Sequence, residues 1–136
     1  MERLEEAGDP AAIVEFDLRL WVDGPGQPAD RVPPAVRESV RAMSLGVADP
    51  SRVHGRPIPL RPPAADRLGD LRIPLHAMAG ALDVSDVWAT AQHLRDACVD
   101  AAAELVPGVA HMVAMEDPAL VADRVTALVV RAGGLG

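Results

Sequence analysis

The segment RIPLHAMAG, residues 72–80, constrains the fold of this chain more than any other part of the sequence. It is apolar at nearly every position, so a strand formed there is apolar on both faces, as in a central strand of a parallel sheet with helices on each side. Residues 102–106 are Ala-rich and are predicted to form a second strand. Two strands are too few for a buried parallel sheet. We therefore expect this region to be the end of a sheet whose other strands are absent from the sequence.

Helices are predicted after both strands. Ser85 is expected to cap a helix that runs to about Ala97, and Asp117-Pro118 to begin the last helix. Residues 64–136 therefore predict the order strand–helix–strand–helix, which is typical of a parallel α/β unit. The predicted fold class is α/β, with two parallel strands and flanking helices.

The front of the chain, residues 1–63, is predicted to be a helical region that ends in a Pro-rich linker. Its first helix begins at Asp9-Pro10 and its second at Pro33-Pro34. In the second helix, Val40 is expected to face the core and Arg37 to face water. The apolar side of the first helix is expected to comprise Ile13, Val14, Phe16, Leu20 and Trp21.

Charge and composition exclude several classes of partner. The net charge is −7, so binding to the phosphate backbone of nucleic acids is not expected. Cys98 is the single cysteine, which rules out an intrachain disulfide and indicates a reducing, cytoplasmic compartment. No apolar run approaches the roughly 18 residues of a membrane-spanning helix, and the acidic start lacks the apolar core of a signal peptide.

An acid and a base follow the two predicted strands. Asp83 comes just after the first strand and His111 just after the second. The carboxyl ends of parallel strands meet at one edge of a sheet, so these side chains are expected to lie together. The carboxylate would hold one imidazole nitrogen, and the other nitrogen would take a proton from a nucleophile and return it to a leaving group.

The segments GALD, residues 80–83, and VPGVAHMVAMEDP, residues 106–118, resemble the carboxy-terminal part of the α/β-hydrolase family. The resemblance implies that Asp83 is the acid and His111 the base of a Ser-Asp-His triad that hydrolyses an ester, lactone or similar acyl bond without a metal or cofactor. It further implies that residues 1–63 are the helical cap that family members place before the acid strand.

Two departures from the family pattern stand out. Ala110 replaces the glycine that usually precedes the histidine, and no G-x-S-x-G nucleophile motif is present. The nearest sequence is AMSLG around Ser44, which follows a predicted helix where the family has a strand. We therefore expect a partial chain that supplies the acid and the base, lacks the nucleophile and is inactive alone.

Several alternatives remain open at this point. One alternative is a chain that works with a separate amino-terminal half that completes the site, or that associates with itself through exposed strand edges. The others are a small non-catalytic binding or scaffold protein, and a complete hydrolase that uses Ser44. Asp83 could simply cap the helix near Ser85, with Asp86 as a rival acid, and His111 could be an ordinary turn residue.

Overall fold

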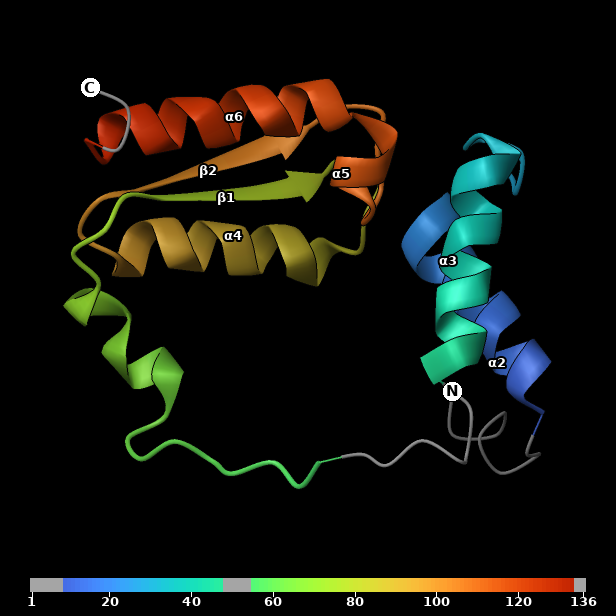
Figure 1. Cartoon of the computed structure of the whole chain (residues 1–136), viewed down its shortest axis with the longest axis horizontal. Helices are drawn as coiled ribbons and strands as arrows, with labels where there is room; N and C mark the ends of the chain where they lie inside the picture. The colour runs from blue at the N-terminus through green and yellow to red at the C-terminus, as the bar shows by residue number, and fades with distance from the viewer. Residues whose placement is uncertain (1–8, 48–54, 134–136) are drawn as a thin grey trace.

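The computed structural model describes residues 9–47 and 55–133, which form a pair of packed helices and a small α/β unit (Figure 1). The elements in chain order are α2 (Pro10–Asp17), the π-helix η1 (Leu18–Asp23), α3 (Pro34–Val47), the 3₁₀ helix η2 (Ala64–Asp70), β1 (Leu75–Gly80), α4 (Ser85–Ala97), β2 (Ala101–Val106), α5 (Val113–Glu116) and α6 (Pro118–Arg131).

The two strands form a parallel sheet between two helices, which confirms the predicted fold class. Their register runs from Leu75 opposite Ala101 to Gly80 opposite Val106. Helix α4 covers one face of the sheet and α6 the other (Figure 1). Within the described residues, each strand has the other as its only neighbour, so the outer edge of each is unpaired.

Aspartate caps begin two of the helices as predicted. The Asp9 side chain accepts hydrogen bonds from the backbone N–H groups of Ala11 and Ala12, and Asp117 accepts from that of Leu120. The prediction for Ser85 was wrong, because α4 has Val84 at its N-cap and no side chain caps it. Ser85 is instead the first residue of the helix.

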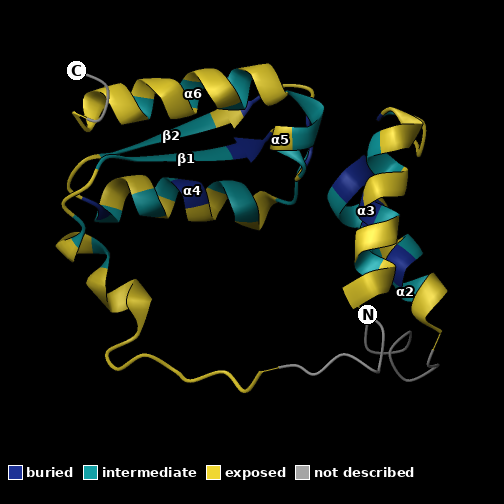
Figure 2. Ribbon diagram, viewed as in Figure 1, coloured by how far each residue is buried: buried dark blue, intermediate teal, exposed yellow. Residues whose placement is uncertain are grey.

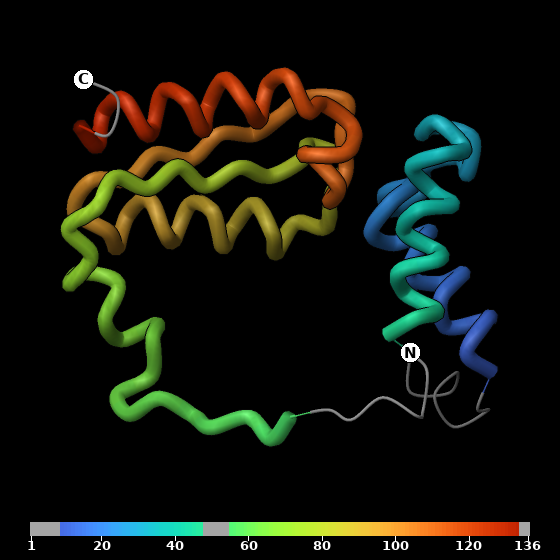
Figure 3. The backbone as a smooth tube through the Cα atoms, in the orientation of Figure 1, coloured from blue at the N-terminus to red at the C-terminus, as the bar shows by residue number. Residues whose placement is uncertain are grey.

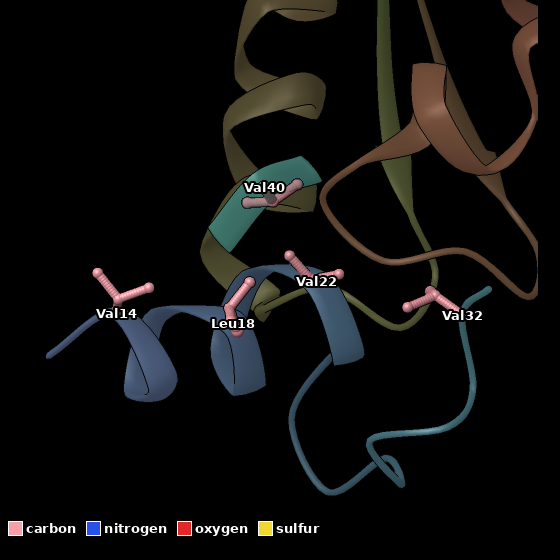
Figure 4. Close-up of a cluster of buried hydrophobic side chains, with 5 residues drawn as sticks. All are labelled: Val14, Leu18, Val22, Val32 and Val40. Carbon is pink, nitrogen blue, oxygen red and sulfur yellow. The ribbon is translucent and has the colours of Figure 1, made fainter. Parts of the chain in front are cut away.

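The front helices have a small core of their own. The first helix continues past Asp17 as η1, so that Val14, Leu18 and Val22, spaced four apart, point to one side and are buried. Val32 and Val40 complete this cluster (Figure 4). The sequence placed Val14 and Val40 correctly but missed Leu18 and Val22. Phe16, expected inside, is exposed.

Arg37 does not face water, contrary to expectation. Its guanidinium binds the carboxylates of Asp23 and Glu15, with Nε–Oδ1 and Nη2–Oε1 distances of 3.0 and 2.6 Å. The hydrogen bonds that Arg37 donates to Asp23 and, with a smaller effect, to Glu15 raise the pKa of Arg37. This part-buried network ties α2 and η1 to α3.

The front helices lie beyond the carboxyl ends of the strands, on the same side as α5 (Figures 1 and 3). Met112 and Met115 pack against the core of the front helices, so the two parts share an apolar contact there. Much of α6 is exposed, as is the segment that leads from residue 55 to η2 (Figure 2). The division of the chain at residue 63 stays a prediction.

Candidate functional site

The acid turn is held against the histidine loop by backbone hydrogen bonds. The chain leaves β1 at Gly80, and the N–H groups of Ala81 and Leu82 donate to the carbonyls of Val106 and Val109, at 2.8 and 3.0 Å. These carbonyls belong to the end of β2 and to the loop after it, so the hydrogen bonds hold the turn after β1 beside the loop after β2. Asp83 and His111 lie in these two segments and are thereby placed next to each other.

Asp83 Oδ2 lies 2.7 Å from Nδ1 of His111. The other carboxylate oxygen, Oδ1, accepts a hydrogen bond from the N–H of Val84 at 2.8 Å. The Asp83 side chain is 2% exposed and that of His111 is 43% exposed. The site therefore has a buried carboxylate with both oxygens hydrogen-bonded and an imidazole that reaches the surface.

This geometry sets the chemistry available to the imidazole. An ionised carboxylate only accepts hydrogen bonds, so Nδ1 of His111 carries the proton. In the neutral ring, Nε2 is then free to accept a proton, and the adjacent carboxylate stabilises the imidazolium that results. Asp86 does not compete for this role, because its contacts are within its own helix: Oδ1 accepts from Ser85 and its carbonyl from Thr90.

The end of η1 forms one wall beside the histidine. The N–H of His111 donates to the carbonyl of Trp21 at 3.2 Å, and the two rings have centroids 4.9 Å apart at a tilt of 57°. His111 therefore contacts Trp21 through both its backbone N–H and its imidazole ring. From the sequence, Trp21 was predicted only to pack on the apolar side of the first helix, and this contact with His111 was not predicted.

Ala110, the departure from the family pattern, is completely buried at this junction. Gly24 follows η1 with φ of 92°, and a Cβ built on it would lie 3.3 Å from the methyl group of Ala110 and 2.6 Å from the carbonyl oxygen of Leu82. A side chain at residue 24 has no room, whereas the Ala110 methyl is accommodated. Alanine before the histidine is therefore compatible with this packing.

A hollow of about 440 Å³ lies beside His111, between the edge of β1 and the last helices. It is mostly apolar and contains no serine, threonine or cysteine among the described residues that line it. Those residues are His76, Met78, His111, Met112, Val113, Ala114, Met115, Val121 and Val125. The apolar lining suits a hydrocarbon portion of a ligand, with the imidazole as the polar group.

Among the described residues, no serine or threonine hydroxyl forms a hydrogen bond with His111. Ser44 lies within α3, in a hollow formed with Ile13, Asp17 and Met43, and not at a turn between a strand and a helix. Thr90 lines a second hollow that His111 also reaches, but its hydroxyl donates to the carbonyl of Asp86. Ser51 falls outside the described residues.

A second histidine, His76, sits in a separate ion-pair cluster on the sheet. Its Nε2 lies 2.9 Å from Oε2 of Glu104, and Arg124 forms two bonds of 2.7 Å to the same carboxylate. The Arg124 hydrogen bond lowers the pKa of Glu104. His93 is exposed on α4, and His54 falls outside the described residues.

A metal site and a membrane-spanning helix each require a characteristic set of residues. Across residues 9–47 and 55–133, no group of three or more His, Cys, Asp or Glu side chains is arranged to hold a metal ion. Not one helix in that part of the chain combines the length and the apolar character that crossing a bilayer requires.

No protein-family model matches the sequence, and no curated protein matches it. Among solved structures, the crystal structure of proline iminopeptidase from Mycobacterium smegmatis is similar over 96% of this chain, with 23% sequence identity and a TM-score of 0.57. The chain spans 46% of the length of that protein. At this identity the likeness shows the fold alone. The chain has part of an α/β-hydrolase-like fold.

Proposed function

We propose that Asp83 and His111 are the acid and the base of a hydrolase that cleaves an acyl bond through a nucleophile located outside these 136 residues. The observation that carries the proposal is the 2.7 Å contact between a buried carboxylate and a half-exposed imidazole at the carboxyl ends of adjacent parallel strands. In this fold, that edge of the sheet is where reactive groups gather.

The geometry suggests a separate role for each of the two residues. Asp83 fixes the ring and stabilises the imidazolium, while Nε2 of His111 removes a proton from the nucleophile and then protonates the leaving group. A donor pair for the oxyanion and the nucleophile itself come from another segment or another chain. The 136-residue chain alone has no ester hydrolase activity.

The front segment, residues 1–63, acts in this proposal as the cap of the site, and residues 64–136 supply its part of the core. Support comes from the position of η1, whose Trp21 contacts His111. The apolar hollow beside His111 favours an acyl substrate with a hydrocarbon portion. Because the similar solved protein is a proline iminopeptidase, proline amides belong in the substrate panel with esters and lactones.

The test is co-expression of this chain with the polypeptide encoded immediately upstream, followed by assay with chromogenic esters and a fluorophosphonate probe. We expect turnover and serine labelling in the co-purified complex and neither in the chain alone. His111→Ala and Asp83→Asn should each reduce turnover by a factor of about 10³ or more.

Asp86→Asn is the matched control, since it changes a nearby aspartate in the first turn of α4 whose contacts lie within that helix. It should retain the activity of the unsubstituted complex. Ester hydrolysis that survives His111→Ala would contradict the proposal. If a folded complex showed no turnover and no labelling, the chain would instead be a non-catalytic binding protein.

A further inference from the structure

We propose that Arg31 and Glu116 are positioning residues for His111. Their ion pair joins the loop that carries the histidine to the end of η1, so that the base is held from the cap side as well as by Asp83. The inference rests on the proposed function, since it concerns the placement of that base.

The first part of the link is between Glu116 and the histidine loop. Oε1 of Glu116 accepts a hydrogen bond of 3.0 Å from the N–H of Ala110, the residue directly before His111. The Glu116 side chain is 6% exposed. A carboxylate this buried, bonded to a backbone N–H, fixes the conformation of the loop at the point where it turns toward the histidine.

The second part is a two-pronged ion pair. Arg31 reaches both carboxylate oxygens of Glu116, with Nη1–Oε2 and Nη2–Oε1 distances of 2.5 and 3.1 Å. Nη1 also donates to the carbonyl of Gly108 at 3.0 Å. The guanidinium therefore binds the histidine loop at two places, directly at Gly108 and through Glu116 at Ala110.

The third part anchors the same guanidinium to η1. Nε of Arg31 donates to the carbonyl of Asp23 at 2.6 Å, and Nη2 to that of Val22 at 2.7 Å. The last carbonyls of a helix lack partners within the helix, so an arginine placed there satisfies them. The carbonyl of Trp21, one residue earlier, accepts the N–H of His111.

These hydrogen bonds together enclose the backbone of His111 between η1, Arg31 and Glu116. The histidine loop is bonded to η1 directly through the N–H of His111, and indirectly through Arg31, which binds Gly108 and, by way of Glu116, Ala110. Lysine cannot reproduce this, because a single ammonium lacks the planar fork that serves a carboxylate and three carbonyls together. Small displacements of a base relative to its reacting group reduce catalysis steeply, which gives such fixing a function beyond stability.

The structure offers a matched control for this network. Arg124 also forms a two-pronged pair with a carboxylate, Glu104, and that carboxylate contacts a different histidine, His76. Substitutions at Arg31 and Arg124 therefore remove the same kind of ion pair, but next to different imidazoles.

The experiment uses NMR on the full chain labelled with ¹⁵N. It reads amide exchange at Ala110 and His111, which reports the fixing of the loop, and the ¹⁵N shifts of each imidazole, which report the tautomer. In Arg31→Ala we expect exchange at both amides to be faster by about tenfold or more, because Arg31 holds Glu116 and the end of η1, which carry the acceptors of the two amides. We also expect His111 to lose its single Nδ1–H tautomer while His76 is unchanged.

Arg124→Ala should give the reverse pattern, altering the signals of His76 and leaving exchange at Ala110 and His111 within about twofold, since the two networks share no hydrogen-bond partner. If Arg31→Ala left the His111 signals unchanged, or if Arg124→Ala disturbed them equally, the inference would be overturned.

Partial variants keep the test decisive if Arg31→Ala does not fold. Arg31→Lys and Glu116→Gln should each show the same faster exchange at Ala110 and His111. Val40→Ala, which weakens the front core without touching the network, should not change the His111 tautomer. If neither partial variant changed the exchange, the positioning role would be refuted.

The two proposals can fail separately in this design. A wild-type His111 without the Nδ1–H tautomer would contradict the acid–base pair, whereas amide exchange would still test the link through Arg31. An inactive complex with normal tautomer and exchange effects would contradict the hydrolase and leave the positioning network intact.

Discussion

The Cα of Gly80 lies so close to the carbonyl group of Ala110 that no Cβ fits between them. The end of β1 and the residue before His111 therefore touch through backbone alone. We predict that Gly80→Ala separates the two turns, destabilises the chain by about 1–3 kcal/mol as overpacking does, and weakens the Asp83–His111 contact. Urea unfolding and the imidazole ¹⁵N shifts of His111 measure both effects.

The control for that substitution is Gly69→Ala. A Cβ at Gly69 would meet its nearest neighbour, the carbonyl oxygen of Ala97, at an ordinary contact distance of 3.7 Å. Its stability should be within about 0.5 kcal/mol of wild type. Equal effects of the two substitutions would contradict the importance of the close approach at Gly80.

Removal of Arg37 should be far more damaging than its place on a helix surface suggests. Asp23 is 1% exposed, and Arg37→Ala leaves its carboxylate buried without a counter-charge, which costs about 3–5 kcal/mol. Urea unfolding followed by circular dichroism tests this. Arg19→Ala is the control, because Arg19 also faces Glu15 but is 74% exposed, and its loss should change stability by less than about 0.5 kcal/mol.

The stability of the front helices should depend on pH through Glu15. The Arg37 hydrogen bond, assisted by Arg41 and opposed by burial, lowers the pKa of Glu15 from 4.5 to about 2. The ionised form is thus favoured by folding, and its contribution is complete above about pH 4.5 and lost as the pH falls toward 2. After solvent screening we expect about 1 kcal/mol at neutral pH.

The measurement compares urea unfolding of wild type and Glu15→Gln from pH 7 to pH 3. The difference between them should shrink as the pH falls. Glu38→Gln should show little difference at any pH, since Glu38 is 72% exposed and forms one ion pair of 3.3 Å with Arg41. A Glu15→Gln difference that stays constant with pH would exclude this ionisation as its source.

The outer edge of β1 and the exposed side of α6 should promote self-association of the isolated chain. Val125 and Val129 on α6 are 53% and 38% exposed, and Val125 lines the hollow beside β1. Exposed apolar surface beside an unpaired strand favours association. Size-exclusion chromatography with light scattering should detect oligomers at micromolar concentration.

Val125→Glu with Val129→Glu should shift that distribution toward monomer. Met43→Glu, at an equally exposed apolar position on α3, should not. A wild-type chain that is monomeric at high concentration would show that the exposed valines do not drive association.

The sequence was most informative where backbone and apolar pattern dominate. The two strands, their parallel pairing and the Asp9 and Asp117 caps follow from local patterns that few other arrangements satisfy. The meeting of Asp83 with His111 follows from strand direction, because parallel strands end at the same edge.

Long polar side chains were the part that could not be predicted. Arg37 sits at a helical position that usually faces water, and Arg31 lies in a turn, so only the tertiary arrangement reveals their buried partners. The π-helical turn of η1 was missed for a similar reason. Val14, Leu18 and Val22 are spaced as in an ordinary α-helix. The wider π-helical turn is distinguished only by its backbone hydrogen bonds, which join residues five apart.

The acceptors that η1 offers to the rest of the site are the backbone carbonyls of Trp21, Val22 and Asp23. A backbone carbonyl persists whatever side chain is attached to it. Side chains along η1 can therefore change over generations, and alter the chemical character of this wall beside His111, while the backbone acceptors for Arg31 and His111 remain. Selectivity and reactivity would then evolve as separable traits within one short polypeptide.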